Sequence, residues 1–171
     1  MSPEKLYDPY AEILDLFNKK GIHYVVVGMS GINYYAASAK ETFTTQDFDI
    51  HVKPTIKNVK DAIAVLKDKG YDIVVGEDLL RDKLVKKVVQ ERKTILANDS
   101  YGILFELILE VSGFNFKQMA SDAKIFQVNN IPIRVAKLSK LLTSKKIAGR
   151  KKDKLFLERY KILLEENERD N

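Results

Sequence analysis

The stretch Thr45-Gln46-Asp47-Phe48-Asp49-Ile50-His51-Val52 is the most informative part of this chain. Side chains of a β-strand point alternately to its two faces, so its apolar residues are expected on one face and its two aspartates side by side on the other. Two carboxylates this close raise each other's proton affinity, so a fold gains no stability from the pairing itself. Such a pair suits Mg²⁺ bound together with substrate phosphates. The alternative is a half-exposed strand with its acids on the wet face.

A glycine turn lies upstream of the acids. The apolar run Tyr24-Val25-Val26-Val27 ends in Gly28-Met29-Ser30-Gly31, and a helix-like stretch follows. A turn from strand to helix exposes backbone N–H groups that favour phosphate. Gly28 would allow close backbone approach, and the Ser30 hydroxyl would donate to a phosphate oxygen. A buried strand that ends in glycine is the alternative, but the acid pair on the next predicted strand favours a phosphate site beside a metal site.

These two motifs resemble the nucleotidyltransferase superfamily of polymerase-β-like fold. In that family a Gly-Gly or Gly-Ser turn is followed by Asp-x-Asp on the neighbouring strand and by a third acid on a later strand. The resemblance runs from about Val25 to Tyr160 and is strongest to the bacterial branch that contains abortive-infection and toxin–antitoxin enzymes. Met29 departs from the family's second glycine or serine, and Phe43 replaces an arginine found in many relatives. Thr45, a nucleotide-binding position in the family pattern, is retained.

The resemblance assigns the third acid to Glu106, within the apolar run that extends from Ile103 to Leu109. A charge among so many apolar neighbours is costly unless it is paired or bound to metal. The turn Val111-Ser112-Gly113 that follows also fits the family pattern. The alternative is that Glu106 faces solvent from an edge strand.

The resemblance also covers a basic segment near the C-terminus. Lys145, Arg150, Lys152 and Asp153 match the family's Lys-x(4)-Arg-x-Lys-Asp pattern. Lys145 would meet nucleotide phosphates as a point charge, and Arg150 would hold them with two parallel hydrogen bonds. Asp153 would orient a basic neighbour or cap the final helix.

Positive charge is concentrated in one part of the chain. Residues 1–136 contain eighteen basic and eighteen acidic residues, whereas Lys137 to Lys161 contains ten basic and two acidic residues, a net charge of +8. The last ten residues have a net charge of −3, which brings the total to +5. A localised basic face attracts polyanions such as RNA. A solvated, lysine-rich helix surface is the alternative.

The pattern of the whole chain predicts an α/β (α+β) domain with a mixed β-sheet flanked by helices. Residues 1–136 would form the core, and residues 137–171 a basic helical segment packed on it. The expected helices span residues 10–20, 31–39, 59–69 and 116–123, while residues 78–89 are ambiguous between helix and strand. The expected strands span residues 24–27, 48–52, 71–75, 94–97, 103–109, 124–128 and 131–135.

Composition narrows the setting in which the protein works. The 171 residues contain no cysteine, which excludes disulfides and thiolate metal sites. No run of eighteen apolar residues is present, so no membrane partner is expected. The N-terminal residues do not resemble a secretory signal, which favours a cytoplasmic location.

Three aromatic or imidazole side chains near the motifs have open roles. His51 shares a predicted strand face with the two acids, so it could contact the metal or the substrate. The alternative is a histidine that lies behind the acids or at the surface. Tyr34 and Tyr35 would stack on a base, although at least one is expected in the core.

We interpret the chain as an enzyme, a metal-dependent nucleotidyltransferase that uses an NTP and releases pyrophosphate. Asp47, Asp49 and Glu106 would hold Mg²⁺, or Mn²⁺ in its place, and would carry the catalysis. Gly28, Ser30, Thr45, Lys145 and Arg150 would bind the nucleotide. The favoured acceptor is tRNA, bound through Lys137 to Lys161, with an antitoxin protein as a further partner if the protein is a toxin. A protein or small-molecule acceptor remains open, as does a non-catalytic member of the fold that binds RNA or protein.

Overall fold

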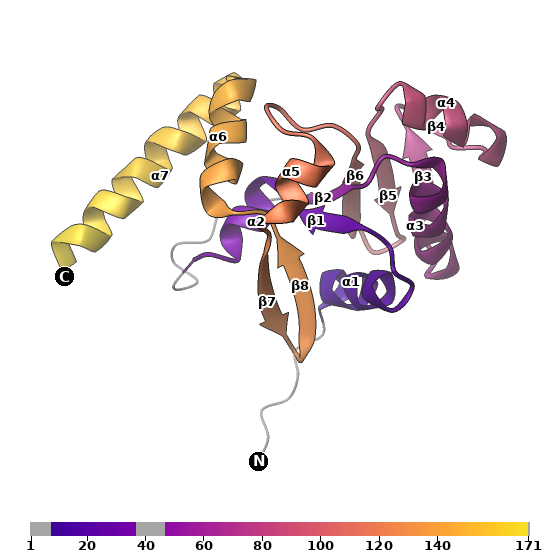
Figure 1. Cartoon of the computed structure of the whole chain (residues 1–171), viewed down its shortest axis with the longest axis horizontal. Helices are drawn as coiled ribbons and strands as arrows, with labels where there is room; N and C mark the ends of the chain where they lie inside the picture. Colours follow the sequence, from indigo (N-terminus) through magenta and orange to yellow (C-terminus); the bar gives the residue numbers. More distant parts are fainter. Residues whose placement is uncertain (1–7, 37–46, 171) are drawn as a thin grey trace, which may run out of the picture.

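The strand that carries the two acids, β2 (Phe48–Val52), lies inside the sheet. In the computed structural model, which describes residues 8–36 and 47–170 and side chains as far as Lys161, β2 pairs in parallel with β6 (Leu104–Ile108) and antiparallel with β1 (Tyr24–Val26). Within these residues the sheet has eight strands in the order β4-β3-β5-β6-β2-β1-β8-β7 (Figure 1). The remaining strands are β3 (Asp72–Val75), β4 (Asp78–Leu79), β5 (Ile95–Asn98), β7 (Lys124–Val128) and β8 (Ile131–Val135).

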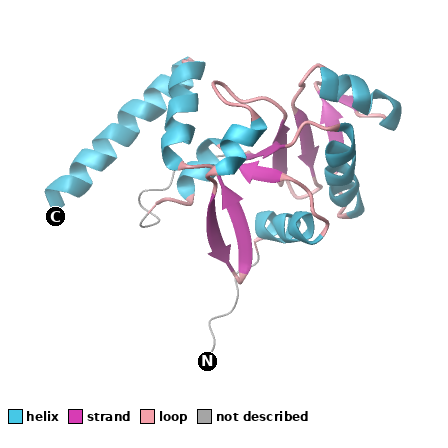
Figure 2. Cartoon of the chain, in the orientation of Figure 1, coloured by secondary structure: helices cyan, strands magenta, loops and turns pink. Residues whose placement is uncertain are grey.

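Several helices begin where a side chain accepts the first free backbone N–H groups, as helix starts commonly require. Asp8 caps α1 (Pro9–Lys19) by accepting from the N–H groups of Tyr10 and Ala11 at 3.0 and 3.1 Å. Thr55 caps α3 (Ile56–Asp68), and Asn115 forms a capping box with Gln118 at the start of α5 (Phe116–Ser121). These caps fix where the helices begin that alternate with the strands along the chain (Figure 2).

The two faces of β2 meet different helices. On one face, Phe48 stacks on Tyr10 of α1, with ring centroids 4.5 Å apart. On the other face, His51 meets the ring of Phe116 in α5, and Asp49 lies against the start of α2 (Gly28–Asn33). The alternation expected from the sequence is therefore present, and the acids share the face on which α2 and α5 lie.

Tyr34 and Tyr35 pack into an aromatic cluster around Phe126 of β7. Their ring centroids lie 5.6 and 5.0 Å from that of Phe126, and the Tyr35 hydroxyl donates to the carbonyl of Ala136 at 2.8 Å. Tyr34 also meets Phe48 edge-on. Both rings therefore support the fold at this place, and the base-stacking role considered for them has no structural support.

Two helices follow the last strand. The first, α6 (Leu138–Ala148), packs against α2, where Leu141 is buried. Gly149 ends α6 in the left-handed conformation, with φ of 61°, and α7 (Lys151–Asp170) then runs away from the sheet as a long helix (Figure 1).

The structure confirms the predicted fold class, a mixed α/β arrangement of one mixed sheet and flanking helices. One prediction needs correction, and one ambiguity is resolved. The helix after β1 begins at Gly28 rather than near Gly31, because the glycine itself turns the chain from strand into helix. The ambiguous residues 78–89 contain both kinds of element: the short β4, a 3-10 helix η2 (Asp82–Leu84), and α4 (Val85–Gln90).

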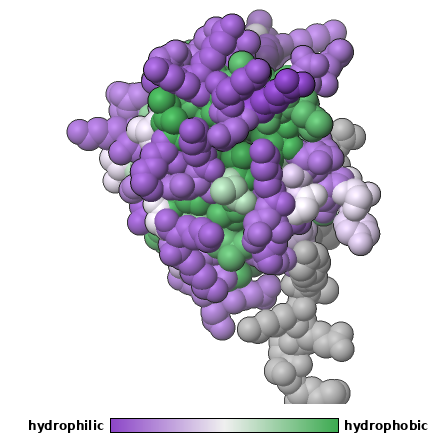
Figure 3. Space-filling model, turned by 90° about the vertical axis from the view of Figure 1, so that its right-hand side faces the viewer, coloured by the Kyte–Doolittle hydropathy of each residue, from purple (hydrophilic) through white to green (hydrophobic). Residues whose placement is uncertain are grey.

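The face formed around α3 and α4 is mostly polar. Figure 3 shows hydrophilic side chains over most of it, with apolar surface visible between them. Exposed large apolar residues in this part of the chain are Ile56, Leu79 and Leu84. Among the described residues, no helix is both long enough and apolar enough to cross a membrane.

Candidate active site

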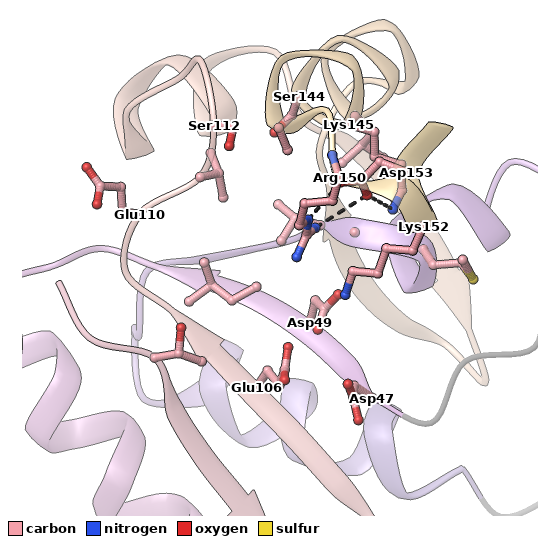
Figure 4. A pocket seen from close by; sticks show the side chains of 18 of the residues that line it. Asp47, Asp49, Glu106, Glu110, Ser112, Ser144, Lys145, Arg150, Lys152 and Asp153 are labelled. Atoms are coloured by element: carbon pink, nitrogen blue, oxygen red, sulfur yellow. Dashed lines mark hydrogen bonds and ion pairs between the residues drawn. The ribbon is translucent and has the colours of Figure 1, made fainter. Parts of the chain in front are cut away.

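A cleft of about 760 Å³ opens over one face of β2, β6 and β5, between the sheet and the junction of α6 with α7. Asp47, Asp49 and Glu106 line its sheet side, and Lys145, Arg150 and Lys152 line its helical side (Figure 4). The rest of the lining is made by Val27, Gly28, Met29, Gly76, Thr94, Leu96, Ile108, Glu110, Val111, Ser112, Met119, Leu141, Ser144, Ala148 and Asp153. The cleft thus has an acidic wall facing a basic wall.

The sheet brings the predicted third acid next to the acid pair. Asp49 and Glu106 are direct partners in the parallel pairing of β2 with β6. Residues paired in this way lie on the same face of neighbouring strands, about 4.8 Å apart along the hydrogen-bonding direction. Glu106 is flanked by β2 and β5, so it lies inside the sheet and the edge-strand alternative does not hold.

Burial and neighbouring acids strongly favour the protonated form of Asp49. The pKa of Asp49 is raised to about 8, first by burial, then by hydrogen bonding and repulsion from Glu106 and by the charge of Asp47. Lys145 acts in the opposite direction, but it does not outweigh these effects. Ionising a carboxyl group in these surroundings costs free energy, and a bound cation would remove that cost.

The carboxylates fit a hard divalent cation, although they are not a complete site. Oδ1 of Asp49 is buried and has no hydrogen-bond partner, so an oxygen ligand is available in the cleft. Among the described residues, however, no group of three or more histidine, aspartate or glutamate side chains is arranged to hold a metal ion. Carboxylate oxygens with an incomplete shell suit Mg²⁺, which usually takes its remaining ligands from water and substrate phosphates.

Gly28 lies directly against Asp49. Its φ is +64°, and a Cβ built at this position would collide with Oδ2 of Asp49 and lie 3.0 Å from its Cγ. Only glycine combines this conformation with this approach at low cost. The sequence predicted close backbone approach at Gly28; the neighbour that the structure shows is the Asp49 carboxylate.

Ser30 has a different environment from the one predicted. Its hydroxyl is buried, donates to the carbonyl of Val27 at 3.0 Å, and accepts from the N–H of Asp49 at 3.0 Å. The single hydroxyl proton is therefore used inside the protein and cannot donate to a phosphate oxygen in this arrangement. Ser30 instead ties the first turn of α2 to β2 and fixes the backbone of Asp49.

The basic wall is held together by Asp153. This side chain is 1% exposed and accepts from Nε of Arg150 at 2.7 Å, while Nζ of Lys145 lies 3.6 Å from its Oδ1. The Lys145 ammonium also lies over the ring of Phe156, 4.8 Å from the centroid. Lys152 extends toward Asp49 from above (Figure 4).

Several lining residues were not predicted as site residues. Met29 lines the cleft, and Glu110, Ser112 and Ser144 add polar groups farther from the acid pair (Figure 4). Glu110 and Ser112 follow β6 directly, so a search of the residues just beyond a site-bearing strand would have found them. Ser144 gives no comparable signal. Thr45 and Phe43 lie outside the described residues.

His51 lies on the same face of β2 as the acids, but beneath α5. It is 1% exposed, and burial lowers its pKa to about 4, against a smaller opposing effect from the Leu109 carbonyl. The imidazole is therefore neutral at pH 7. It is not among the residues that line the cleft, so it lies behind the acids in the protein interior.

Comparison with known proteins gives a likeness of fold. Neither the protein-family models nor the curated proteins contain a match to this chain. Among solved structures, the chain is similar to the crystal structure of the lincosamide antibiotic adenylyltransferase LnuA with lincomycin bound. The TM-score is 0.52, the sequence identity is 13%, and the match covers 80% of this chain and 84% of that chain. The chain therefore shares the overall fold of this adenylyltransferase, and the likeness is one of fold alone.

Proposed function

We propose that this protein is a metal-dependent nucleotidyltransferase, which moves a nucleoside monophosphate from an NTP to an acceptor hydroxyl. One observation supports the proposal most strongly: the paired strands place Asp49 beside Glu106, with Asp47 on the same wall, directly opposite Lys145, Arg150 and Lys152. Carboxylates facing cations across one cleft suit a triphosphate that is bound together with a divalent cation. The likeness of fold to an adenylyltransferase agrees with this chemistry.

Each wall has its own task in this proposal. Asp47, Asp49 and Glu106 would hold Mg²⁺, or Mn²⁺ in its place, and a metal bound there would supply positive charge to neutralise the phosphates. Lys145, Arg150 and Lys152 hold the phosphates. Glu106 accepts the proton of the acceptor hydroxyl as that oxygen bonds to the α-phosphorus and the bond to the departing pyrophosphate breaks.

The direct test is transfer itself. The protein is incubated with each of the four α-labelled NTPs, Mg²⁺, and either total RNA or cell lysate, and the products are separated by size. Label on a macromolecule together with equimolar pyrophosphate is the expected result. Retention of a bound partner with no label and no pyrophosphate would favour the non-catalytic alternative.

Metal and nucleotide are expected to bind together. Because the acids do not form a complete metal site, tight Mg²⁺ binding should need triphosphate oxygens. The melting temperature should therefore rise much more with Mg²⁺ and NTP than with either alone, by mass-action linkage. Differential scanning fluorimetry measures this, with Ca²⁺-free buffer and a nucleoside as control ligand. Equal shifts from Mg²⁺ with and without the NTP would contradict the shared-ligand arrangement.

We further propose that the acceptor is RNA, with tRNA as the favoured class and the toxin role as its consequence. The support is the net charge of +8 between Lys137 and Lys161, which exceeds what the phosphates of one nucleotide need. In the structure Lys146, Lys151 and Lys154 are exposed on α6 and α7, so they are available to a second polyanion. A toxin of this kind should halt growth when it is expressed and should be relieved by its antitoxin.

Changing Lys146, Lys151 and Lys154 together to Gln should weaken RNA binding and flatten its salt dependence. Each phosphate contact contributes roughly 0.7–0.9 to the log–log slope, so about two units should be lost if all three lysines contact phosphates. NTP affinity should change little, because these lysines do not line the cleft. Filter binding at several salt concentrations measures the slope, and Lys57→Gln with Lys60→Gln on α3 is the control. An unchanged slope would identify this surface as merely solvated and favour a small or protein acceptor.

A further inference from the structure

Asp153 contacts two of the three cations, Arg150 and Lys145, that the α6–α7 junction presents to the cleft. Its Oδ2 accepts from Nε of Arg150 at 2.7 Å and from the Arg150 backbone N–H at 3.2 Å, and its Oδ1 accepts from a terminal guanidinium nitrogen of the same residue at 3.3 Å. Oδ1 also lies 3.6 Å from Nζ of Lys145. One buried carboxylate thus connects the end of α6, the turn, and the start of α7.

These contacts join the charges into one unit. Burial by itself would raise the pKa of Asp153, but the hydrogen bonds and charge of Arg150, with a contribution from Lys145, hold it below its ordinary value. Removing a partner of a buried carboxylate strongly destabilises the folded protein, because an uncompensated charge is left in the interior. Removing the carboxylate instead takes away the group that orients the cations.

Lys145 lies between two carboxylates. Its side chain is 13% exposed and faces Asp153 on the helical side of the cleft, while Asp49 lies on the sheet side and attracts the ammonium when its carboxyl is ionised. A buried ammonium needs a charged partner, since an isolated one is costly. If Asp153 were neutral, Asp49 would be the remaining carboxylate that attracts the Lys145 ammonium in this part of the described structure.

We propose that Asp153 is a positioning residue, which holds Lys145 and Arg150 on the helical wall and so keeps Lys145 from closing onto Asp49. The inference rests on the proposed function, because it assigns the open space between the two walls to nucleotide and metal. It adds a role that the three acids do not supply: Asp153 keeps Asp49 available to a cation by giving Lys145 another partner.

The test uses Asp153→Asn, which keeps the side-chain shape and an acceptor for the Arg150 N–H but removes the charge. Mn²⁺ binding without nucleotide, followed by electron paramagnetic resonance, should weaken about tenfold, and so should NTP affinity. Adding Lys145→Gln to this variant should restore Mn²⁺ binding to the parent level, but not NTP affinity. Asp61→Asn is the matched control, because it removes a carboxylate from the surface ion pair with Lys57 and should change neither. Asp153→Ser is a second neutral variant with the same expected results, should the asparagine variant not fold.

Parent-like binding of Mn²⁺ and NTP by a folded neutral variant would overturn the inference. So would a loss of Mn²⁺ binding that Lys145→Gln leaves uncorrected, since that would indicate general damage to the site. A readout that needs no ligand is the exchange of the Arg150 Nε–H with water, measured by ¹⁵N NMR, which should become faster in Asp153→Asn. If the parent binds no NTP, the proposed function fails, while this exchange rate still decides whether Asp153 positions Arg150.

Discussion

Asp49→Asn is expected to lower nucleotidyl transfer by about 10³-fold or more. The asparagine keeps the size of the side chain but removes the charge that a divalent cation requires, and losing about 4 kcal/mol of transition-state stabilisation corresponds to this factor. Asp49 is the acid most closely surrounded by the other parts of the site: Glu106 beside it, Gly28 against it, and Ser30 on its backbone N–H. Pyrophosphate release at saturating NTP and Mg²⁺ measures the effect.

The same substitution should stabilise the metal-free protein, and more so at higher pH. The folded-state pKa of Asp49 is raised to about 8 by burial and by Glu106, above the ordinary value of 3.8. The folded state therefore binds this proton more tightly than the unfolded state, and the parent loses stability as pH rises from about 4 to about 8. Asparagine does not titrate, so its advantage should grow across that interval and then level off. A gain of 1 kcal/mol would raise the melting temperature by about 2–4 °C in a protein of this size.

Thermal unfolding in EDTA at several pH values tests this second effect. Asp72→Asn is the control, because it removes an exposed carboxylate from another strand, β3. Near-parent transfer by Asp49→Asn would remove Asp49 from the mechanism. A stability difference that stays constant with pH would show that Asp49 is ionised in the folded protein at all these pH values.

Local sequence patterns predicted the elements of this fold better than their contacts. The bounds of β2, β7 and β8 follow from alternation and from the turn residues between them, and all three agree with the structure. Residues 78–89 could not be assigned, because their apolar residues suit a helix and a strand equally; the chain resolves this by forming a short strand and then a short helix.

The arrangement of the candidate site depends on the pairing of distant strands, which cannot be predicted from local sequence patterns. The acid pair was visible in the sequence because alternation alone puts Asp47 and Asp49 on one face. The partnership of Asp49 with Glu106 depends on the register of two strands far apart in the chain, and only the resemblance to a family suggested it. The hydroxyl of Ser30 looked free to meet phosphate, because sequence does not show that Val27 and Asp49 occupy it.

Gly28→Ala is the second change with a large expected effect. At φ of +64° an alanine costs about 1–2 kcal/mol by conformation alone, and its Cβ would also collide with the carboxylate of Asp49. Either the start of α2 or the Asp49 side chain must move, and Ser30 holds the backbone of both together. Transfer should therefore fall steeply, and the loss of stability should exceed the conformational cost.

Gly21→Ala separates the two causes. Gly21 has a nearly equal φ of +68°, but no atom lies within 4 Å of a Cβ built there, and it lies in the turn between α1 and β1, away from the cleft. Gly21→Ala should lose only the stability that corresponds to the conformational cost, and it should keep full transfer activity. Gly28→Ala should lose more stability and most of its transfer activity. Urea unfolding and pyrophosphate release measure the two quantities. If both alanine variants lose equal stability and both stay active, then the close approach of Gly28 to Asp49 is not what shapes the acidic wall, and the constraint on Gly28 is its backbone conformation alone.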